Sequence, residues 1–190
     1  MLTYSDLKKG TVFVLDGAPH VVLEYEFLRM QQRKPVAKTV VKNIINGKVL
    51  ERTFHYGDSF EEAEIEKKPI KYLYNSRGEF WFCEPSDPSK RFFLKEDIIG
   101  SPAKFLKANV EAMAIVFSGK IIGVEVPIKV DLIVKEAPPA IKGNTAQGGT
   151  KTIVLETGAT VNAPLFVNQG DIVRVNTQTG EYYERAEKTK

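Results

Sequence analysis

Few side chains in this sequence have the chemistry that catalysis requires. The histidines are His20 and His55, and the one cysteine is Cys83. Each histidine lies in an alternating apolar and polar run, where a half-exposed strand residue is far commoner than a base or a metal ligand. A lone cysteine has no second thiol for a disulfide or a shared metal, so we expect Cys83 to be a small buried apolar residue. The sequence therefore predicts no catalytic residue, no metal site and no cofactor.

Cations gather in one segment of the chain. Residues 27–50 contain no acid but hold Arg29, Arg33, Lys34, Lys38, Lys42 and Lys48. Three of these lie in the polar, glycine-free loop 28–35. A basic hairpin tip can bind phosphates by Coulomb attraction and counterion release. Since a basic loop also keeps a protein soluble, composition leaves a nucleic-acid contact and a solvated loop equally open.

Short alternating runs bounded by turn residues predict that β-strands carry this loop. In the N-terminal part they cover 11–15, 20–25, 36–45 and 48–54, with Asp16-Gly17 and Asn46-Gly47 as hairpin turns. The pattern fits a small β-barrel and recurs twice further along the chain. The one predicted helix has Ser101 as its N-cap and Pro102 in its first turn.

Length and composition agree with a folded globular protein. The chain has 190 residues, 43% of them hydrophobic and 27% charged, and a net charge of +3 that no third of the sequence concentrates. No apolar run approaches the roughly 20 residues that cross a bilayer, and the N-terminus lacks the pattern of a signal peptide. We therefore expect a cytoplasmic protein with no membrane partner.

Motifs along the whole chain resemble those of the family of bacterial translation elongation factor P, relatives of the eukaryotic and archaeal initiation factor five-A. The family's C-terminal pattern K-x-A-x4-G-x2-[LIV]-x-V-P-x2-[LIV]-x2-G is followed by Lys151, Gly158, Val161, Pro164, Val167 and Gly170, with departures at Ile153 and Ala163. Further matches, in the family's order, are Leu15-Asp16-Gly17-x-Pro19, Glu26-Phe27, Asn43-x-x-x-Gly47, Tyr72-Leu73-Tyr74, Pro138-x-x-x-Lys142-Gly143 and Gly180-Glu181-Tyr182.

The resemblance implies an all-β fold and a division into three domains. The expected fold is an SH3-like (KOW-type) N-terminal barrel followed by two OB-fold β-barrels, with one short helix in the middle domain and an L-shaped, tRNA-like arrangement. The expected domains are 1–64, which carries the functional hairpin loop 28–35, then 65–127 and 128–190.

The resemblance also implies a function that needs no active site. Such a factor is a monomer that binds rRNA between the ribosomal P and E sites, beside P-site peptidyl-tRNA. It relieves stalling at consecutive prolines by positioning the P-site tRNA with its loop tip. The ribosome performs the reaction, so the resemblance implies a protein that is not an enzyme.

The loop tip is where this sequence departs from the family. Members commonly carry P-G-K-G with a modified lysine or arginine, whereas the corresponding residues here are Met30-Gln31-Gln32-Arg33, with Gln32 at the modified position. Glutamine has no amine to acylate, so we expect no modification at Gln32, and Lys34 is the less favoured alternative. The tip residues Met30, Gln31 and Gln32 are then expected to face the peptidyl-transferase centre, while Arg29, Arg33 and Lys34 contact phosphates.

Weaker candidate contacts on the E-site and mRNA side follow from position in the family. They are Gly143, Asn144, Thr145, Tyr182 and Arg185. Asn144 replaces a family acid and is equally well explained as a turn residue. For Tyr182 and Arg185, strand packing and an exposed cation are equally good explanations.

Two other functions stay open. One is a paralogous factor for a different arrest motif. The other is a general single-strand RNA-binding OB-fold protein, which needs aromatic side chains on an exposed strand face. The candidates for that face are Phe80, Trp81, Phe82, Phe92 and Phe93, whose clustering beside the helix favours a core instead.

Overall fold

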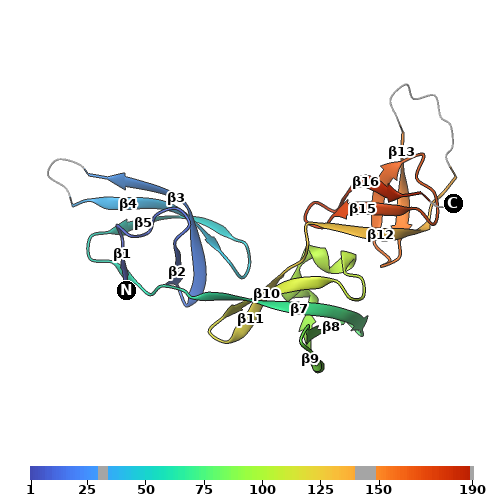
Figure 1. Ribbon diagram of the computed structural model, residues 1–190. Helices are drawn as coiled ribbons and strands as arrows, with labels where there is room; N and C mark the ends of the chain where they lie inside the picture. The colour runs from blue at the N-terminus through green and yellow to red at the C-terminus, as the bar shows by residue number, and fades with distance from the viewer. Residues whose placement is uncertain (30–33, 140–148, 189–190) are drawn as a thin grey trace. The chain divides into compact units, whose positions relative to one another are not determined.

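The structure is a computed structural model that describes residues 1–29, 34–139 and 149–188 (Figure 1). Contacts divide the chain into two compact units. The first holds Met1–Lys68 together with Ile115–Gly123, and the second holds Pro69–Ala114 with Val124–Lys190. Antiparallel strands make up most of the described residues. The division into domains at 64/65 and 127/128 stays a prediction.

The N-terminal sheet has four strands in the order β2-β3-β4-β5. Their bounds are β2 (Val12–Leu15), β3 (Ala18–Leu28), β4 (Val36–Asn43) and β5 (Val49–His55). A short ladder pairs β1 (Leu2–Thr3) with β6 (Ser59–Phe60). The alternation of apolar residues predicted from the sequence places one face of this sheet over a small core of Leu7, Phe13, Val22, Val41 and Phe54.

The two predicted hairpin turns differ in outcome. Asp16 and Gly17 both have positive φ, 52° and 75°, as a two-residue primed turn requires, so this turn is confirmed. At the second turn β4 ends at Asn43, because the Asn43 side-chain oxygen accepts hydrogen bonds from the backbone N–H groups of Ile45 and Asn46. These local bonds replace further ladder bonds and lengthen the connection between β4 and β5 to residues 44–48. Asn46-Gly47 therefore lies within this longer turn and is not a two-residue turn by itself.

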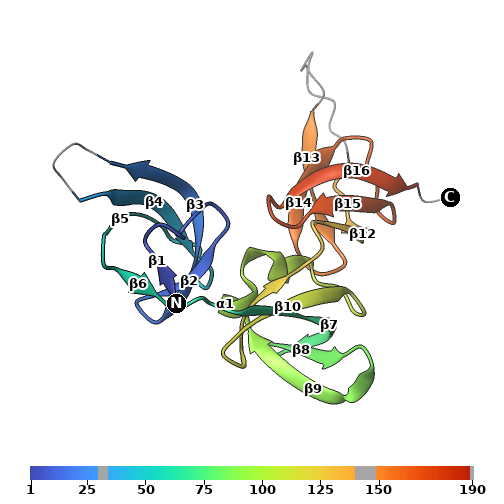
Figure 2. The ribbon, with the colours of Figure 1, turned by 60° about the vertical axis from the view of Figure 1, so that its left-hand side comes forward.

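The middle sheet has the strand order β11-β10-β7-β8-β9. Its strands are β7 (Ile65–Ser76), β8 (Glu79–Glu84), β9 (Asp87–Lys95), β10 (Glu111–Phe117) and β11 (Lys120–Glu125). Figure 2 shows β7, β8 and β9 as neighbouring strands. Five-stranded sheets of this kind are typical of OB-folds.

The predicted helix near Ser101 is present in a different form. One turn of α-helix, α1 (Glu96–Ile99), is followed by the 3₁₀-helix η1 (Ser101–Phe105). The prediction of Ser101 as N-cap is wrong, since the cap of η1 is Gly100 and no side chain bonds the cap. Gly100 has φ of 75°, a left-handed conformation that ends α1 before the serine can cap a longer helix.

The C-terminal sheet has the order β14-β13-β12-β15-β16. Its strands are β12 (Lys129–Glu136), β13 (Thr150–Leu155), β14 (Thr160–Pro164), β15 (Ile172–Asn176) and β16 (Glu181–Glu187). Their inward residues, among them Leu132, Ile153 and Val173, form the core of this part of the second unit.

Two residues singled out for chemistry are buried. Cys83 is 1% exposed, as predicted. His20 is 3% exposed and not half-exposed, because its ring packs near Phe13 and its Nδ1 lies 2.9 Å from the Ala18 carbonyl oxygen. His55, at the end of β5, is exposed. No helix among the described residues is long and apolar enough to span a membrane.

Candidate nucleic-acid interface

The candidate interface lies where β3 and β4 part. Their antiparallel ladder continues to the pair Leu28 and Val36, so Arg29 and Lys34 both leave the sheet at the same end. Both side chains are exposed. The strands thus bring to one end of the sheet two cations that lie five positions apart in the sequence.

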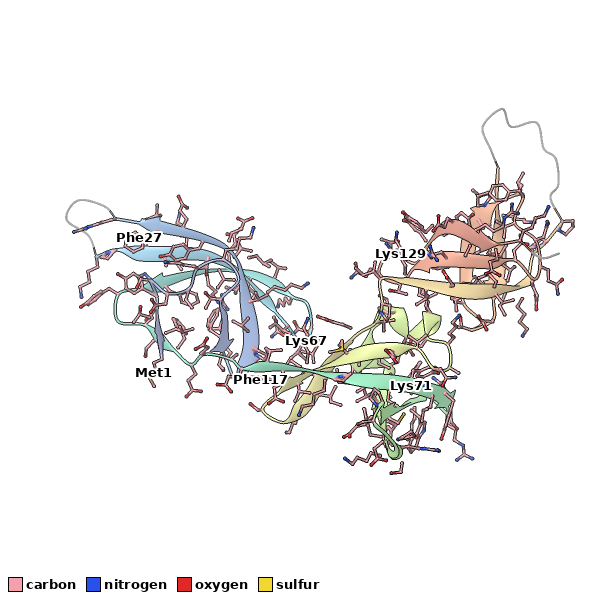
Figure 3. The ribbon with its side chains drawn as sticks, in the orientation of Figure 1. Met1, Phe27, Lys67, Lys71, Phe117 and Lys129 are labelled. Carbon is pink, nitrogen blue, oxygen red and sulfur yellow. The ribbon has the colours of Figure 1, made fainter. Side chains whose placement is uncertain are left out.

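A group of aromatic side chains stands at the base of this hairpin end. The Tyr4 ring stacks on Phe27 at 6.2 Å between centroids and meets the edge of Tyr56 at 6.1 Å. The Lys34 Nζ lies 5.7 Å from the Tyr56 ring centre. Phe27, labelled in Figure 3 near the end of β3, is 44% exposed, and Tyr56 is 64% exposed. We call Tyr4, Phe27 and Tyr56 the aromatic base.

Sequence reasoning missed the aromatic base. Its members come from three segments that no local pattern connects, and only the folded sheet brings them together. Exposed aromatic rings beside cations suit contact with nucleic acid, because rings stack on bases while ammonium and guanidinium groups neutralise phosphate.

The basic stretch 27–50 does not make one continuous basic surface. Lys38 on β4 lies directly opposite Glu26 on β3, and both line a shallow groove together with Glu24 and Glu51. Glu24 and Glu26 precede the acid-free stretch and Glu51 follows it, and in the folded sheet these acids offset the charge of Lys38. Acidic and basic side chains, Arg52 among them, are therefore mixed in this groove, whereas Arg29 and Lys34 lie beyond the end of the ladder.

The remaining tip residues lie outside the described residues. They are Met30, Gln31, Gln32 and Arg33. The same holds for Gly143, Asn144 and Thr145 among the weaker candidates. Their assigned roles stay predictions.

Arg185 is bound within the C-terminal sheet. Its Nη1 donates to the Phe166 carbonyl oxygen at 3.3 Å and lies 3.4 Å from Oδ2 of Asp171, which is 1% exposed. The guanidinium also lies 4.9 Å from the Phe166 ring centre. Tyr182 packs partly buried against the same core, and this burial raises the pKa of its hydroxyl. These contacts favour a packing role for both residues.

Comparisons with known proteins agree with this picture. Residues 3–60 match the elongation factor P (EF-P) KOW-like domain, and residues 130–185 match the elongation factor P C-terminal domain. Elongation factor P of Clostridium perfringens strain 13 is 40% identical over 185 residues, which cover 97% of this chain and 100% of the relative. Elongation factor P of Moorella thermoacetica is 37% identical over 186 residues, which cover 98% and 100%.

Solved structures show the same fold at low identity. A translation initiation factor eif-5a family protein from Naegleria fowleri superposes with a TM-score of 0.52 at 14% identity, covering 66% of this chain and 96% of the other. The eukaryotic translation initiation factor 5A from Methanococcus jannaschii gives 0.52 at 15% identity, covering 66% and 90%.

A nearly all-β chain with a KOW-type N-terminal domain and full-length matches of this kind is a translation elongation factor. The chain belongs to the elongation factor P family. The resemblance drawn from the sequence motifs and the all-β fold prediction are thereby confirmed.

Proposed function

We propose that the protein binds the ribosome between the P and E sites, beside P-site peptidyl-tRNA, and relieves stalling at consecutive prolines. It acts in the cytoplasm as a monomer of three domains, without a cofactor, and the ribosome performs the reaction. The observation that carries the proposal is the pair of exposed cations, Arg29 and Lys34, at the end of the β3–β4 ladder. Membership of the elongation factor P family supports it.

The mechanism is positioning. Arg29, Arg33 and Lys34 bind phosphates of the tRNA 3′ end or nearby rRNA. The Tyr56 ring of the aromatic base contacts the Lys34 ammonium and restricts its position. Fixing the P-site tRNA lowers the entropic cost of aligning a poorly reactive prolyl substrate. Met30, Gln31 and Gln32 form the part of the loop that faces the peptidyl-transferase centre.

The loop works without modification. Gln32 occupies the family's modified position and has no amine, and Pro35 closes a loop that contains no glycine. A chain segment with few conformations loses less entropy when it binds, so the loop binds with the contacts of its own side chains and without those of an added group.

The test is translation of a proline-run reporter by purified ribosomes. Full-length protein, shown by intact mass to be unmodified, should restore synthesis. Gln32→Ala should lower the rescue and Lys34→Arg should leave it nearly unchanged. The reverse ranking of these variants would remove Gln32 from its role. In native protein, an added mass mapping to Lys34 would exclude the unmodified mechanism.

A related experiment separates this function from that of a paralogue. Ribosome profiling of a strain lacking the protein should show pauses at proline runs. Pauses at other motifs would assign it to a different arrest sequence. The contacts of Gly143, Asn144 and Thr145 toward the mRNA side of the E site belong to the same proposal.

A further inference from the structure

An aromatic row crosses the outer face of β7, β8 and β9. The Tyr74 and Trp81 rings lie 6.1 Å apart with planes 22° from parallel, and the Trp81 and Phe93 rings lie 5.5 Å apart. The register pairs Tyr74 with Trp81 and Trp81 with Phe93, so the three side chains stand side by side on adjacent strands. Tyr74 and Phe93 are each 45% exposed. We call Tyr74, Trp81 and Phe93 the aromatic row.

The core of this sheet lies on the opposite face. Phe80 and Phe82 are 7% and 0% exposed, and Phe82 stacks with Phe92 at 6.0 Å. The expectation of a core is therefore confirmed for Phe80 and Phe82, against which the partly buried Phe92 packs, and is wrong for Phe93. Trp81 is partly buried but lies on the opposite face from this core. Because side chains alternate along a strand, a run of aromatic residues supplies both faces of the sheet. The aromatic row is not part of this core, so core packing does not explain why Tyr74 and Phe93 are aromatic.

Cations stand at both ends of the aromatic row. Lys71 and Arg91 are the register partners of Cys83, which is two positions from Trp81 on β8, so both cations share the face of the row. At the other end Lys95 lies opposite Glu79. Figure 3 labels Lys71 on β7. These positions give three cations and one acid, so the face is net positive. It complements a polyanion, and it has no electrostatic attraction for a peptide with few acids.

We propose that the aromatic row binds single-stranded RNA. Bases stack on the half-exposed rings of Tyr74 and Phe93 and contact the partly buried Trp81 between them, and the cations contact the backbone phosphates. Every base has a flat face, so such a row accepts any sequence. This surface is on a different sheet from the β3–β4 hairpin and goes beyond the function proposed for the loop, since it adds a second RNA contact to the same protein.

The sequence provides a direct probe of this site. Trp81 is the one tryptophan among the chain's fluorescent residues, so tryptophan emission, excited where tyrosine does not absorb, reports on the aromatic row. The full-length protein is titrated with oligouridine of about 12 nucleotides, within the span that one OB-fold binds. Bases bound to the row, next to Trp81, should quench its emission in a saturable, salt-sensitive manner.

Variants test the geometry of the site. Phe93→Ser and Tyr74→Ser change half-exposed side chains, and each should weaken binding about tenfold. Arg91→Gln should reduce the slope of log affinity against log salt by about one, because the ladder partner of Arg91 is the uncharged Cys83. Tyr183→Ser, which removes a ring from β16 that is 54% exposed, is the matched control and should not alter binding. The double variant Arg29→Gln/Lys34→Gln should leave the Trp81 quenching intact, which separates this site from the hairpin.

Several results would overturn the proposal. They are an absence of quenching, equal quenching in folded Phe93→Ser, loss of quenching only in the hairpin variant, and quenching by a peptide in place of oligouridine. Circular dichroism of Phe93→Ser and Tyr74→Ser checks that each variant retains the fold, and either variant suffices for the test.

Discussion

The Lys34 ammonium lies 5.7 Å from the centre of the Tyr56 ring. This contact joins the residue pair that precedes β4 to the residue that directly follows β5. An exposed cation–π contact of this kind contributes about 0.5–1 kcal/mol. It restricts where the Lys34 charge can lie without burying it. The contact therefore helps to aim the cation while leaving it available to a phosphate.

We expect Tyr56→Ala to lower the rate of peptide-bond formation on proline-run messages about two- to fivefold, the range that the energy of this contact allows. Tyr56→Phe keeps the ring and should retain most of the activity. Tyr183→Ala removes the comparable contact of Lys129, whose Nζ lies 3.4 Å from the Tyr183 ring centre, and serves as the control. Equal losses in Tyr56→Ala and Tyr183→Ala would show that the aromatic base has no special role.

Charge at the end of the hairpin should govern binding to the ribosome. We expect Arg29→Gln to weaken binding and to reduce the salt slope by about one, as the loss of one phosphate contact does. Lys38→Gln is the matched control, because Lys38 faces Glu26 across the ladder and is already offset. Filter binding to purified ribosomes over a range of salt measures both. A larger effect of Lys38→Gln would move the interface to the groove on the sheet.

The sequence predicted the strands around the hairpin better than the surface they make. Alternation located β2 to β5, and the Asp16-Gly17 turn followed from the need for positive φ. The acid-free stretch 27–50 pointed to a basic hairpin tip but did not show that Glu24, Glu26 and Glu51 line the same groove as Lys38 in the folded sheet. Cross-strand neighbours depend on register, and register is a property of the folded sheet.

Asp171 should anchor the C-terminal sheet. Its buried carboxylate lies beside Arg185 and accepts a hydrogen bond from the Asn168 N–H at 2.9 Å. Removing it in Asp171→Ala takes the shared acceptor from the Asn168 N–H and the Arg185 guanidinium, so we expect a loss of about 2 kcal/mol in the free energy of unfolding. Urea denaturation of the full chain measures it. Glu187→Ala, an exposed acid on β16, should change stability by no more than about 0.5 kcal/mol.

Asp131 should make stability depend on acidic pH. Its carboxylate receives two hydrogen bonds from Arg174, at 2.7 and 3.0 Å, and these hold the pKa of Asp131 below its ordinary value. The folded pKa is lower than the unfolded one, so this contribution is complete above about pH 4 and is lost as the pH falls through the folded pKa.

The variant Asp131→Asn should therefore melt at a lower temperature than the parent at neutral pH, with the difference shrinking in acid. Thermal melts across this pH range provide the measurement. A difference that stays constant down to the lowest pH would show that the side chain contributes through packing and not through its charge.

The aromatic residues of the middle sheet show a second limit of sequence reasoning. The run from Phe80 to Cys83 contains apolar residues at every position, so its alternation cannot say which of them face solvent. Burial assigned Phe80 and Phe82 to the core, and the ladder with β7 and β9 placed Trp81 on the other face. The sequence likewise located the helix, but the prediction of Ser101 as its N-cap was wrong because Gly100, with its positive φ, separates α1 from η1.

The most direct test of the central claim is the rate of peptide-bond formation between consecutive prolines on purified ribosomes, measured with protein that intact mass shows to be unmodified. The unmodified protein should accelerate this step, and Arg29→Gln/Lys34→Gln should abolish most of the acceleration while leaving non-proline messages unaffected. Acceleration that requires an added group on Lys34, or that survives the loss of both cations, would contradict the claim that an unmodified basic hairpin positions the P-site tRNA.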